Sequence, residues 1–202
     1  HCSAHAHCIH IRIHLFNASS PFTMSIRSLC LLLCSSFVFS VVAAQDEHPR
    51  TPDNRGYIVQ VGDRVPALSL TDLSGTEHTD VTLLGTTYVL QFTASWCGVC
   101  RKEMPHLEQA VWQRFRQDDF VLLGVDLDEP RGKVADFARQ MAITYPIAPD
   151  PDGQVFYSIA APKSGVTRNV VVDKEGRIVY LTRLFETEEF EAMVDVIDGL
   201  LD

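Results

Sequence analysis

The sequence predicts an α/β domain whose central mixed β-sheet carries helices on both faces. Strand and helix patterns alternate along the chain, which is typical of this class. Residues 120–125 are apolar apart from Gly124, as expected of a strand that is covered on both sides. Two β-rich runs flank Lys174–Glu175–Gly176 and predict an antiparallel hairpin, so the sheet should be mixed.

The first half of the domain is expected to contain two strands and a long helix. In chain order, the elements are a strand at 65–70, a turn at 72–75, a strand at 88–94 and a helix over 98–117. Leu107, Val111 and Phe115 recur at helical spacing and give this helix one apolar face. Pro105 lies inside the helical pattern and should kink it.

The second half is expected to contain fewer regular elements. They are a strand at 120–125, a short helix opened by Asp128–Glu129–Pro130, a loop over 144–165, the hairpin at 170–180 and a final helix. Proline and glycine in residues 144–165 suggest the loop. Thr187 is expected to cap the final helix, with Glu188 and Glu189 in its first turn.

The composition excludes two classes of protein. The chain has 202 residues with a formal charge of −9, which argues against a nucleic-acid partner because such binding requires a basic face. Of its six cysteines, four lie within the first 34 residues and the others are Cys97 and Cys100. The second half therefore contains no cysteine, and a six-cysteine disulfide scaffold is excluded.

The N-terminal region does not read as part of the domain. Residues 1–23 carry five histidines and are interpreted as an upstream extension. The alternative is a metal site, which would use His1, Cys2, His5, His7 and Cys8. Residues 24–44 contain a single charge and an apolar run, and they end in two alanines. They are predicted to be a secretory signal peptide cleaved after Ala44, with an uncleaved membrane anchor as the alternative.

A lipoprotein is not expected, because leucine precedes both Cys30 and Cys34, where bacterial lipoproteins carry a small residue. Cleavage would leave a chain of 158 residues with a formal charge of −11 and no stable membrane insertion. Its predicted organisation is a flexible arm at 45–59 and one domain at 60–202. Its location would be periplasmic or otherwise exported.

Cys97 and Cys100 fall where a predicted strand meets a predicted helix. The positive end of a helix favours a thiolate, and Cys97 would lie nearer to that end. Two intervening residues let the sulfurs bond, which provides a nucleophile and a resolving thiol. The alternatives are a structural disulfide, which would close a very small loop, and half of a zinc site lacking its other ligands. Neither a cofactor nor a metal is predicted.

Residues 91–105 resemble the active-site stretch of thioredoxin-fold proteins, and more specifically of exported TlpA/ResA-type thiol–disulfide oxidoreductases. Pro105 stands where thioredoxins kink the active-site helix, and Glu103 matches an acidic residue that ResA-like proteins keep beside the thiols. The segment around Gly62–Asp63, Pro66 and 72–75 resembles the family's opening strand and hairpin. The resemblance covers about residues 60–201 and implies a thioredoxin-like fold with an N-terminal β-hairpin extension.

The chain departs from the family pattern at two positions. Val99 replaces a proline that many relatives have, and Thr167 stands in the place of the family's cis-proline. Three other residues are supporting candidates. Trp96 is expected to shield the disulfide. Glu103 is expected to exchange a proton with Cys100, or else to be a solvated helix acid. Arg168 is expected either to steady a thiolate or an acidic partner, or to be a surface arginine.

The resemblance implies an exported oxidoreductase that exchanges disulfides with protein partners. A reductase supplied by a membrane electron donor is predicted, and an oxidase that donates disulfides is the alternative direction. Cys97 would attack the partner and Cys100 would resolve the mixed disulfide. One alternative is a peroxiredoxin-like peroxidase, but neither cysteine has that family's proline and threonine at the required spacing. The other is a Sco-like copper carrier, although no histidine follows His106.

Overall fold

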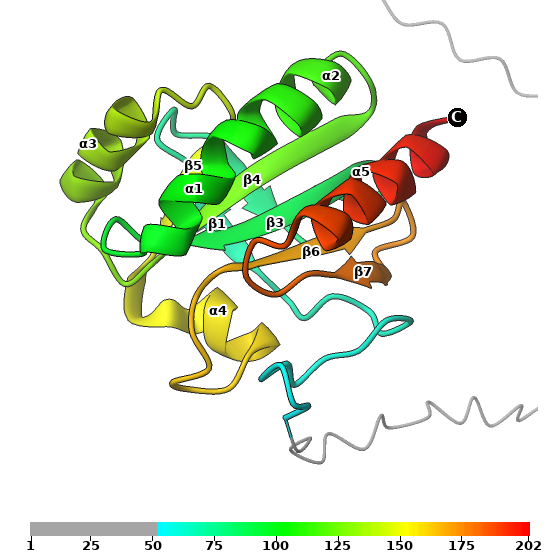
Figure 1. Cartoon of the computed structure of the whole chain (residues 1–202), viewed down its shortest axis with the longest axis horizontal. Coiled ribbons are helices and arrows are strands. Elements are labelled where there is room, and N and C mark those ends of the chain that lie inside the picture. The colour runs from blue at the N-terminus through cyan, green and yellow to red at the C-terminus, as the bar shows by residue number, and fades with distance from the viewer. Residues whose placement is uncertain (1–51) are drawn as a thin grey trace, which may run out of the picture. The chain divides into compact units, whose positions relative to one another are not determined.

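The computed structural model describes residues 52–202, which form a sheet covered by helices on both faces (Figure 1). Its five described strands are β3 (Thr87–Thr93), β4 (Phe120–Leu127), β5 (Ile147–Asp150), β6 (Arg168–Val172) and β7 (Ile178–Leu181). They lie in the order β5-β4-β3-β6-β7. β3, β4 and β5 pair in parallel, whereas β6 is antiparallel to β3 and β7. The predicted mixed sheet and α/β class are confirmed.

A separate hairpin precedes the sheet. β1 (Ser69–Thr71) pairs antiparallel with β2 (Glu77–Thr79), as the predicted N-terminal extension requires. Asp72 closes the turn, because its carboxylate accepts from the backbone N–H groups of Ser74 and Thr76. β1 is shorter than the strand predicted at 65–70. The ladder begins at Ser69, since the N–H of Leu68 donates to the side chain of Asp80 instead of a strand.

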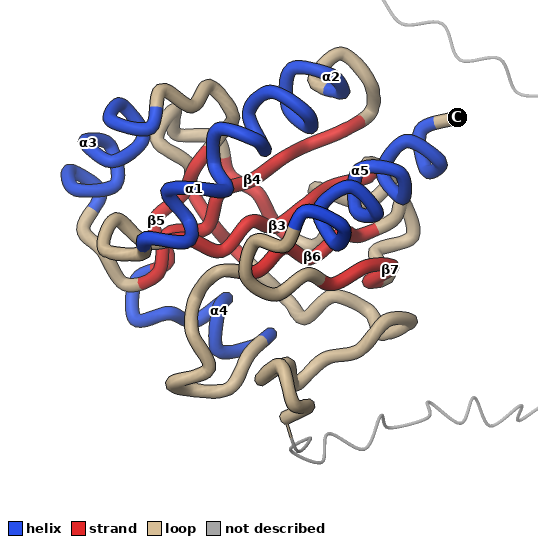
Figure 2. The backbone as a smooth tube through the Cα atoms, viewed as in Figure 1, coloured by secondary structure: helices blue, strands red, loops and turns tan. Residues whose placement is uncertain are grey.

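The helices divide between the two faces of the sheet (Figure 2). The elements are α1 (Gly98–His106), a π-helical turn (Leu107–Trp112), α2 (Gln113–Phe115), α3 (Arg131–Met141), a 3₁₀ turn (Pro151–Gly153), α4 (Gln154–Ile159) and α5 (Thr187–Leu201). Val89 of β3 packs in the core beneath α1, α3 and α5. Its neighbours Leu90 and Phe92 point into the other core, which α4 and Tyr57 cover. This alternation is why all of β3 is buried.

Pro105 lies inside α1, and the helix changes to π-helical spacing at Leu107. Proline has no N–H to donate to the preceding turn, so regular α-helical hydrogen bonding is interrupted there. The N–H of Leu107 is shared between the carbonyls of Glu103 and Met104. The predicted disturbance at Pro105 thus takes the form of a change in helix type.

The loop predicted over 144–165 is wrong, because this region contains β5 and α4. β5 lies against β4 with Ile147 opposite Gly124. A β-carbon on Gly124 would come within 2.9 Å of the Ile147 side chain, so glycine permits this approach. α4 is capped by a residue outside it. The carboxylate of Asp150 accepts from the N–H groups of Val155 and Phe156. A three-residue turn separates Asp150 from α4, so the sequence does not show Asp150 as a capping residue.

Two smaller expectations also need correction. Thr187 is the first residue of α5, so Glu186 occupies the cap position and makes no side-chain capping bond. Glu188 and Glu189 do lie in the first turn. The flexible arm predicted at 45–59 is packed against the domain at Tyr57, which is 1% exposed. Its hydroxyl donates to the carbonyl of Thr182 at 2.5 Å. The domain therefore begins before residue 60.

The predicted signal peptide and the histidine-rich extension lie outside the described residues. Among residues 52–202, no helix combines the length and apolar character needed to cross a membrane.

Replacing Tyr57 should show that the segment before residue 60 stabilises the domain. Tyr57→Ala is expected to lower the free energy of unfolding by about 3–5 kcal/mol, which is usual for a buried aromatic side chain. Tyr57→Phe should cost about 1–3 kcal/mol, because the Thr182 carbonyl loses its donor. Urea unfolding followed by circular dichroism measures both. Tyr157→Ala is the control, since Tyr157 is 44% exposed. Equal losses for Tyr57→Ala and Tyr157→Ala would contradict this account.

Candidate active site

Cys97 stands at the junction between β3 and α1. The strand ends at Thr93, and a tight turn follows in which the N–H of Cys97 donates to the carbonyl of Ala94 at 3.0 Å. Cys97 is the N-cap of α1, with an extended backbone at φ −84° and ψ 105°. Its sulfur accepts from the N–H of Cys100 at 3.1 Å. The sulfur therefore takes the place of a capping oxygen and lies at the positive end of the helix.

Cys97 and Cys100 are joined by a disulfide, with their Cα atoms 5.3 Å apart. Cys97 is 7% exposed and Cys100 is fully buried. Cys97 is thus the less deeply buried of the two, and it lies at the N-terminal end of the helix. Both cysteines pack in the core on the α4 side of the sheet, and Cys97 retains the small exposed fraction of the pair.

Thr167 lies across the disulfide from α1. Antiparallel pairing of β3 with β6 places Phe92 opposite Arg168, so the residue before β6 falls beside the end of β3. The Oγ1 atom of Thr167 is 3.2 Å from the sulfur of Cys97 and 3.3 Å from that of Cys100. The position predicted to replace the family's cis-proline therefore does face the cysteine pair.

Glu103 is buried in α1, one turn beyond Cys100. One carboxyl oxygen accepts from the side-chain amide of Asn169 at 2.7 Å, and the other has no partner within the described residues. Burial raises the pKa of Glu103 to about 7; the negative charge of Glu189 adds to the rise, and the hydrogen bond from Asn169 opposes it. A solvated helix acid is therefore the wrong interpretation. Near neutral pH, this carboxyl group can both bind and release a proton.

Asn169 is a member of the site that the sequence did not indicate. It lies in β6, and its amide nitrogen also contacts the hydroxyl of Thr182 at 2.9 Å. Nothing in the local sequence marks this asparagine, because its role depends on the register between β6 and β3. In that register Asn169 is opposite Gln91 of β3.

Glu129 is a second member that was missed. Its carboxylate accepts from the N–H and hydroxyl of Ser95, at 2.6 and 2.8 Å, two residues before Cys97. The sequence suggested only that Glu129 opens a helix. Asp126 lies in β4, three residues before Glu129. It is fully buried, and neither of its carboxyl oxygens is hydrogen-bonded within residues 52–202. Burial, and then the charge of Glu129, raise the pKa of Asp126 to about 8.

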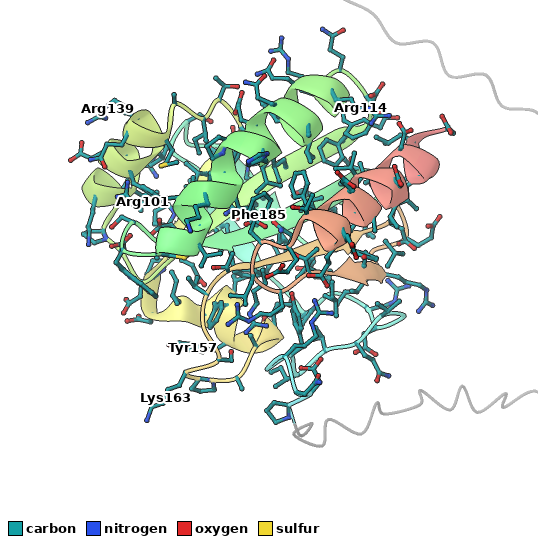
Figure 3. All side chains as sticks on the ribbon, in the orientation of Figure 1. Arg101, Arg114, Arg139, Tyr157, Lys163 and Phe185 are labelled. Atoms are coloured by element: carbon teal, nitrogen blue, oxygen red, sulfur yellow. A yellow bond between two sulfur atoms is a disulfide. The ribbon has the colours of Figure 1, made fainter. Side chains whose placement is uncertain are left out.

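Trp96 is 63% exposed and lies next to the outer cysteine in the chain. The turn that carries it is fixed by Arg101, labelled in Figure 3, whose Nε donates to the carbonyl of Ser95 at 2.9 Å. The exposed indole therefore lies on a fixed turn next to Cys97. Shielding of the disulfide by Trp96 stays a prediction.

Arg168 is neither a surface arginine nor a contact of the sulfurs in the described structure. It is fully buried, and its guanidinium donates to the carbonyls of Arg55, Ser164 and Gly165 and to the hydroxyl of Ser164. It also lies 4.5 Å from the ring centre of Tyr57. Arg168 therefore ties the loop before β6 to the N-terminal segment, because buried carbonyl oxygens need donors.

Within residues 52–202, no three histidine, cysteine, aspartate or glutamate side chains come together as a candidate metal cluster. The described site is built from two cysteines, a hydroxyl at 3.2–3.3 Å from them and a buried carboxyl group on the same helix. A cysteine pair at a strand-to-helix junction, faced by the loop of an antiparallel strand, defines a thiol–disulfide site of the thioredoxin superfamily.

Comparisons with known proteins agree with this class. The model of the AhpC/TSA family matches residues 61–181. ResA, a thiol–disulfide oxidoreductase of Geobacillus thermodenitrificans, is 30% identical over 120 residues, covering 59% of this chain and 67% of ResA. The solution structure of a candidate protein disulfide isomerase from Bacteroides thetaiotaomicron is 46% identical with a TM-score of 0.70, covering 72% and 92% of the two chains.

A candidate thiol:disulfide interchange protein DsbE from Chlorobium tepidum is 25% identical with a TM-score of 0.62, covering 71% of this chain and 99% of its own. The chain belongs to the AhpC/TSA family of the thioredoxin superfamily, and within it to the ResA-like thiol–disulfide oxidoreductases. The predicted thioredoxin-like fold and oxidoreductase class are confirmed.

The raised pKa of Glu103 predicts a pH-dependent effect of Glu103→Gln on stability. The folded pKa of about 7 lies above the ordinary value of 4.5, so the folded chain holds a proton that the unfolded chain releases. The proton on Glu103 therefore stabilises the folded state fully below pH 4.5. This contribution is lost as the pH rises through about 7. Relative to Glu103→Gln, the wild type should lose about 3 kcal/mol of unfolding free energy across this range.

Urea unfolding of both proteins over a pH series, with the disulfide intact, measures this difference. Glu108→Gln is the control on the same helical run. Burial raises the pKa of Glu108, but hydrogen bonds from Thr144 and Gln113 outweigh burial and lower it. The difference in unfolding free energy between wild type and Glu108→Gln should therefore change only below pH 4.5, the ordinary pKa of the group. A difference between wild type and Glu103→Gln that stays constant with pH would contradict the assignment.

Proposed function

We propose that this protein is an exported reductase of protein disulfides, in which Cys97 is the nucleophile and Cys100 the resolving thiol. The observation that carries the proposal is the position of Cys97. It is the N-cap of α1 and the more exposed of the two cysteines, and its sulfur accepts a backbone N–H. Each of these features favours a reactive thiolate.

The proposed reaction is a two-step exchange of disulfides. The Cys97 thiolate attacks one sulfur of the partner's disulfide, and the partner's other sulfur leaves as a thiolate. The Cys100 thiolate then attacks the sulfur of Cys97, and the partner's second sulfur leaves. The partner gains two electrons and two protons, and the Cys97–Cys100 disulfide of the described structure is the product.

Cys100 must lose its proton before it can attack. Glu103 is the proposed acceptor, because it lies three residues further along α1 and therefore on the same side of the helix. With a pKa of about 7, it is neither a permanent anion nor a permanent acid. Its unpartnered carboxyl oxygen leaves an acceptor free for a proton within the described site.

The proposed substrates are disulfides of proteins. The exposed indole of Trp96 next to Cys97 provides apolar contact area of the kind found at protein interfaces. The loop before β6 is fixed by Arg168 and Arg183, so it offers a partner a preformed surface opposite the cysteines. Pro105 is proposed as a supporting residue, because it precedes the change in helix type behind the site.

Export is proposed from the sequence of residues 24–44, which would be removed as a signal peptide after Ala44. Residues 1–23 would be an upstream extension. A membrane electron donor is proposed, because an exported reductase must be reduced again after every turnover. The proposed folded unit extends to residue 202 and includes Tyr57 in addition to the predicted range of 60–202.

Trapping of mixed disulfides in cells tests the proposal. Cys100→Ala cannot resolve, so it should accumulate adducts that disappear on reduction, whereas Cys97→Ala should form none. The trapped chain should begin at Gln45 by mass spectrometry and be found in the exported fraction. Equal adducts with Cys97→Ala would overturn the assignment of the nucleophile. An adduct-free Cys100→Ala would count against the whole function, and trapped chains that retain residues 24–44 would overturn signal-peptide cleavage.

A further inference from the structure

A buried hydroxyl lies against both sulfurs of the cysteine pair. Thr167 is 3% exposed, and its Oγ1 contacts the sulfurs of Cys97 and Cys100 at 3.2 and 3.3 Å. Within residues 52–202 these sulfurs are its hydrogen-bond partners, and no oxygen acceptor competes for the proton. A proline at this position would offer no such donor.

The strength of this contact depends on the redox state of the pair. A disulfide sulfur is a weak acceptor, whereas a thiolate carries a full charge, and hydrogen bonds to charged acceptors are the stronger ones. We propose that the hydroxyl of Thr167 donates a hydrogen bond to the Cys97 thiolate once the disulfide opens, and so stabilises the reactive form. This inference rests on the proposed function of Cys97 and Cys100, and it makes Thr167 a catalytic residue.

The backbone around Thr167 holds the hydroxyl in place. The carbonyl of Thr167 accepts from Nη1 of Arg183 and from the N–H of Leu184, both at 3.2 Å. The next residue, Arg168, anchors the loop from the other side. A donor that is already fixed needs little reorganisation when charge appears on the sulfur.

The donors distinguish the two sulfurs. Cys97 faces both the Thr167 hydroxyl and the N–H of Cys100, at 3.2 and 3.1 Å. For Cys100, the contact within the described residues is the hydroxyl alone. Charge on the opened pair should therefore settle on Cys97. The hydroxyl proton stays on its oxygen throughout, so the two electrons and two protons of the exchange balance as before.

Removing the hydroxyl while keeping the shape of the side chain tests the inference. Thr167→Val should lower the first acid dissociation constant of the reduced cysteine pair about tenfold, measured from the ultraviolet absorbance of the thiolate. At a pH above both thiol pKa values, the equilibrium with glutathione should shift toward the disulfide by a similar factor, about 30 mV. Thr167→Ser keeps the oxygen and should stay within about twofold of wild type.

The charged and titratable groups of the site are the same residues in every variant. They are Glu103 on α1, Asp126 on β4, Glu129 bound to the turn at Ser95 and Arg183 bound to the Thr167 carbonyl. Thr167→Ala compared with Thr167→Ser gives a second pair that differs only in the oxygen, which keeps the test decisive if the valine variant does not fold.

Wild-type acidity in Thr167→Val, or equal shifts in Thr167→Ser and Thr167→Val, would overturn the inference. In both cases Cys97 would still react with a model disulfide, and the proposed function would stand. A wild-type Cys97 that does not react with that disulfide would instead sink the proposed function itself.

Discussion

The antiparallel pairing of β3 with β6 is the constraint on which the site depends. β3 delivers Cys97 to the N-terminus of α1, and β6 brings Thr167 and Asn169 to the same place. A shift of one residue in this register would exchange the faces of every side chain in β6. Thr167 would then leave the sulfurs, and Asn169 would leave Glu103. The chemistry of the pair therefore rests on backbone hydrogen bonds between two buried strands.

Burial acts on both the inner cysteine and the carboxyl group of the site. It keeps Cys100 away from solvent, since this residue is fully buried. It also removes water from Glu103 and raises the pKa of this carboxyl group to about 7. Asn169 limits that rise by donating to the carboxylate. The result is a proton-binding group near neutrality on the helix that carries both thiols.

The sequence predicted the parts of the fold that local patterns determine. The buried strand β3, the helical run after Cys97 and the hairpin of β6 and β7 were found within a few residues, because their periodicity and turns are local. β5 and α4 were missed, since β5 depends on its approach to Gly124 and α4 on capping from Asp150. Both contacts form only after the chain has folded, and the prolines nearby suggested a loop.

In the candidate site, too, residues in local motifs were predicted and residues that act through distant contacts were not. The cysteine motif, Glu103 and Thr167 were visible in the sequence, although Thr167 was noted only as a replaced proline. Asn169 and Glu129 were not, because each acts through a partner more than 30 residues away. Arg168 was assigned to the sulfurs or the surface, whereas the structure buries it against the ring of Tyr57. That contact required the N-terminal segment to pack, which its polar composition did not indicate.

An equilibrium redox titration of the Cys97–Cys100 pair in glutathione buffers tests the central claim most directly. The disulfide fraction would be quantified by mass spectrometry. The account predicts a reversible two-electron couple with a potential near the thioredoxin value, about −270 mV. A potential near about −120 mV would mark a donor of disulfides and contradict the proposed reductase. A pair that does not exchange with glutathione at all would contradict its redox function.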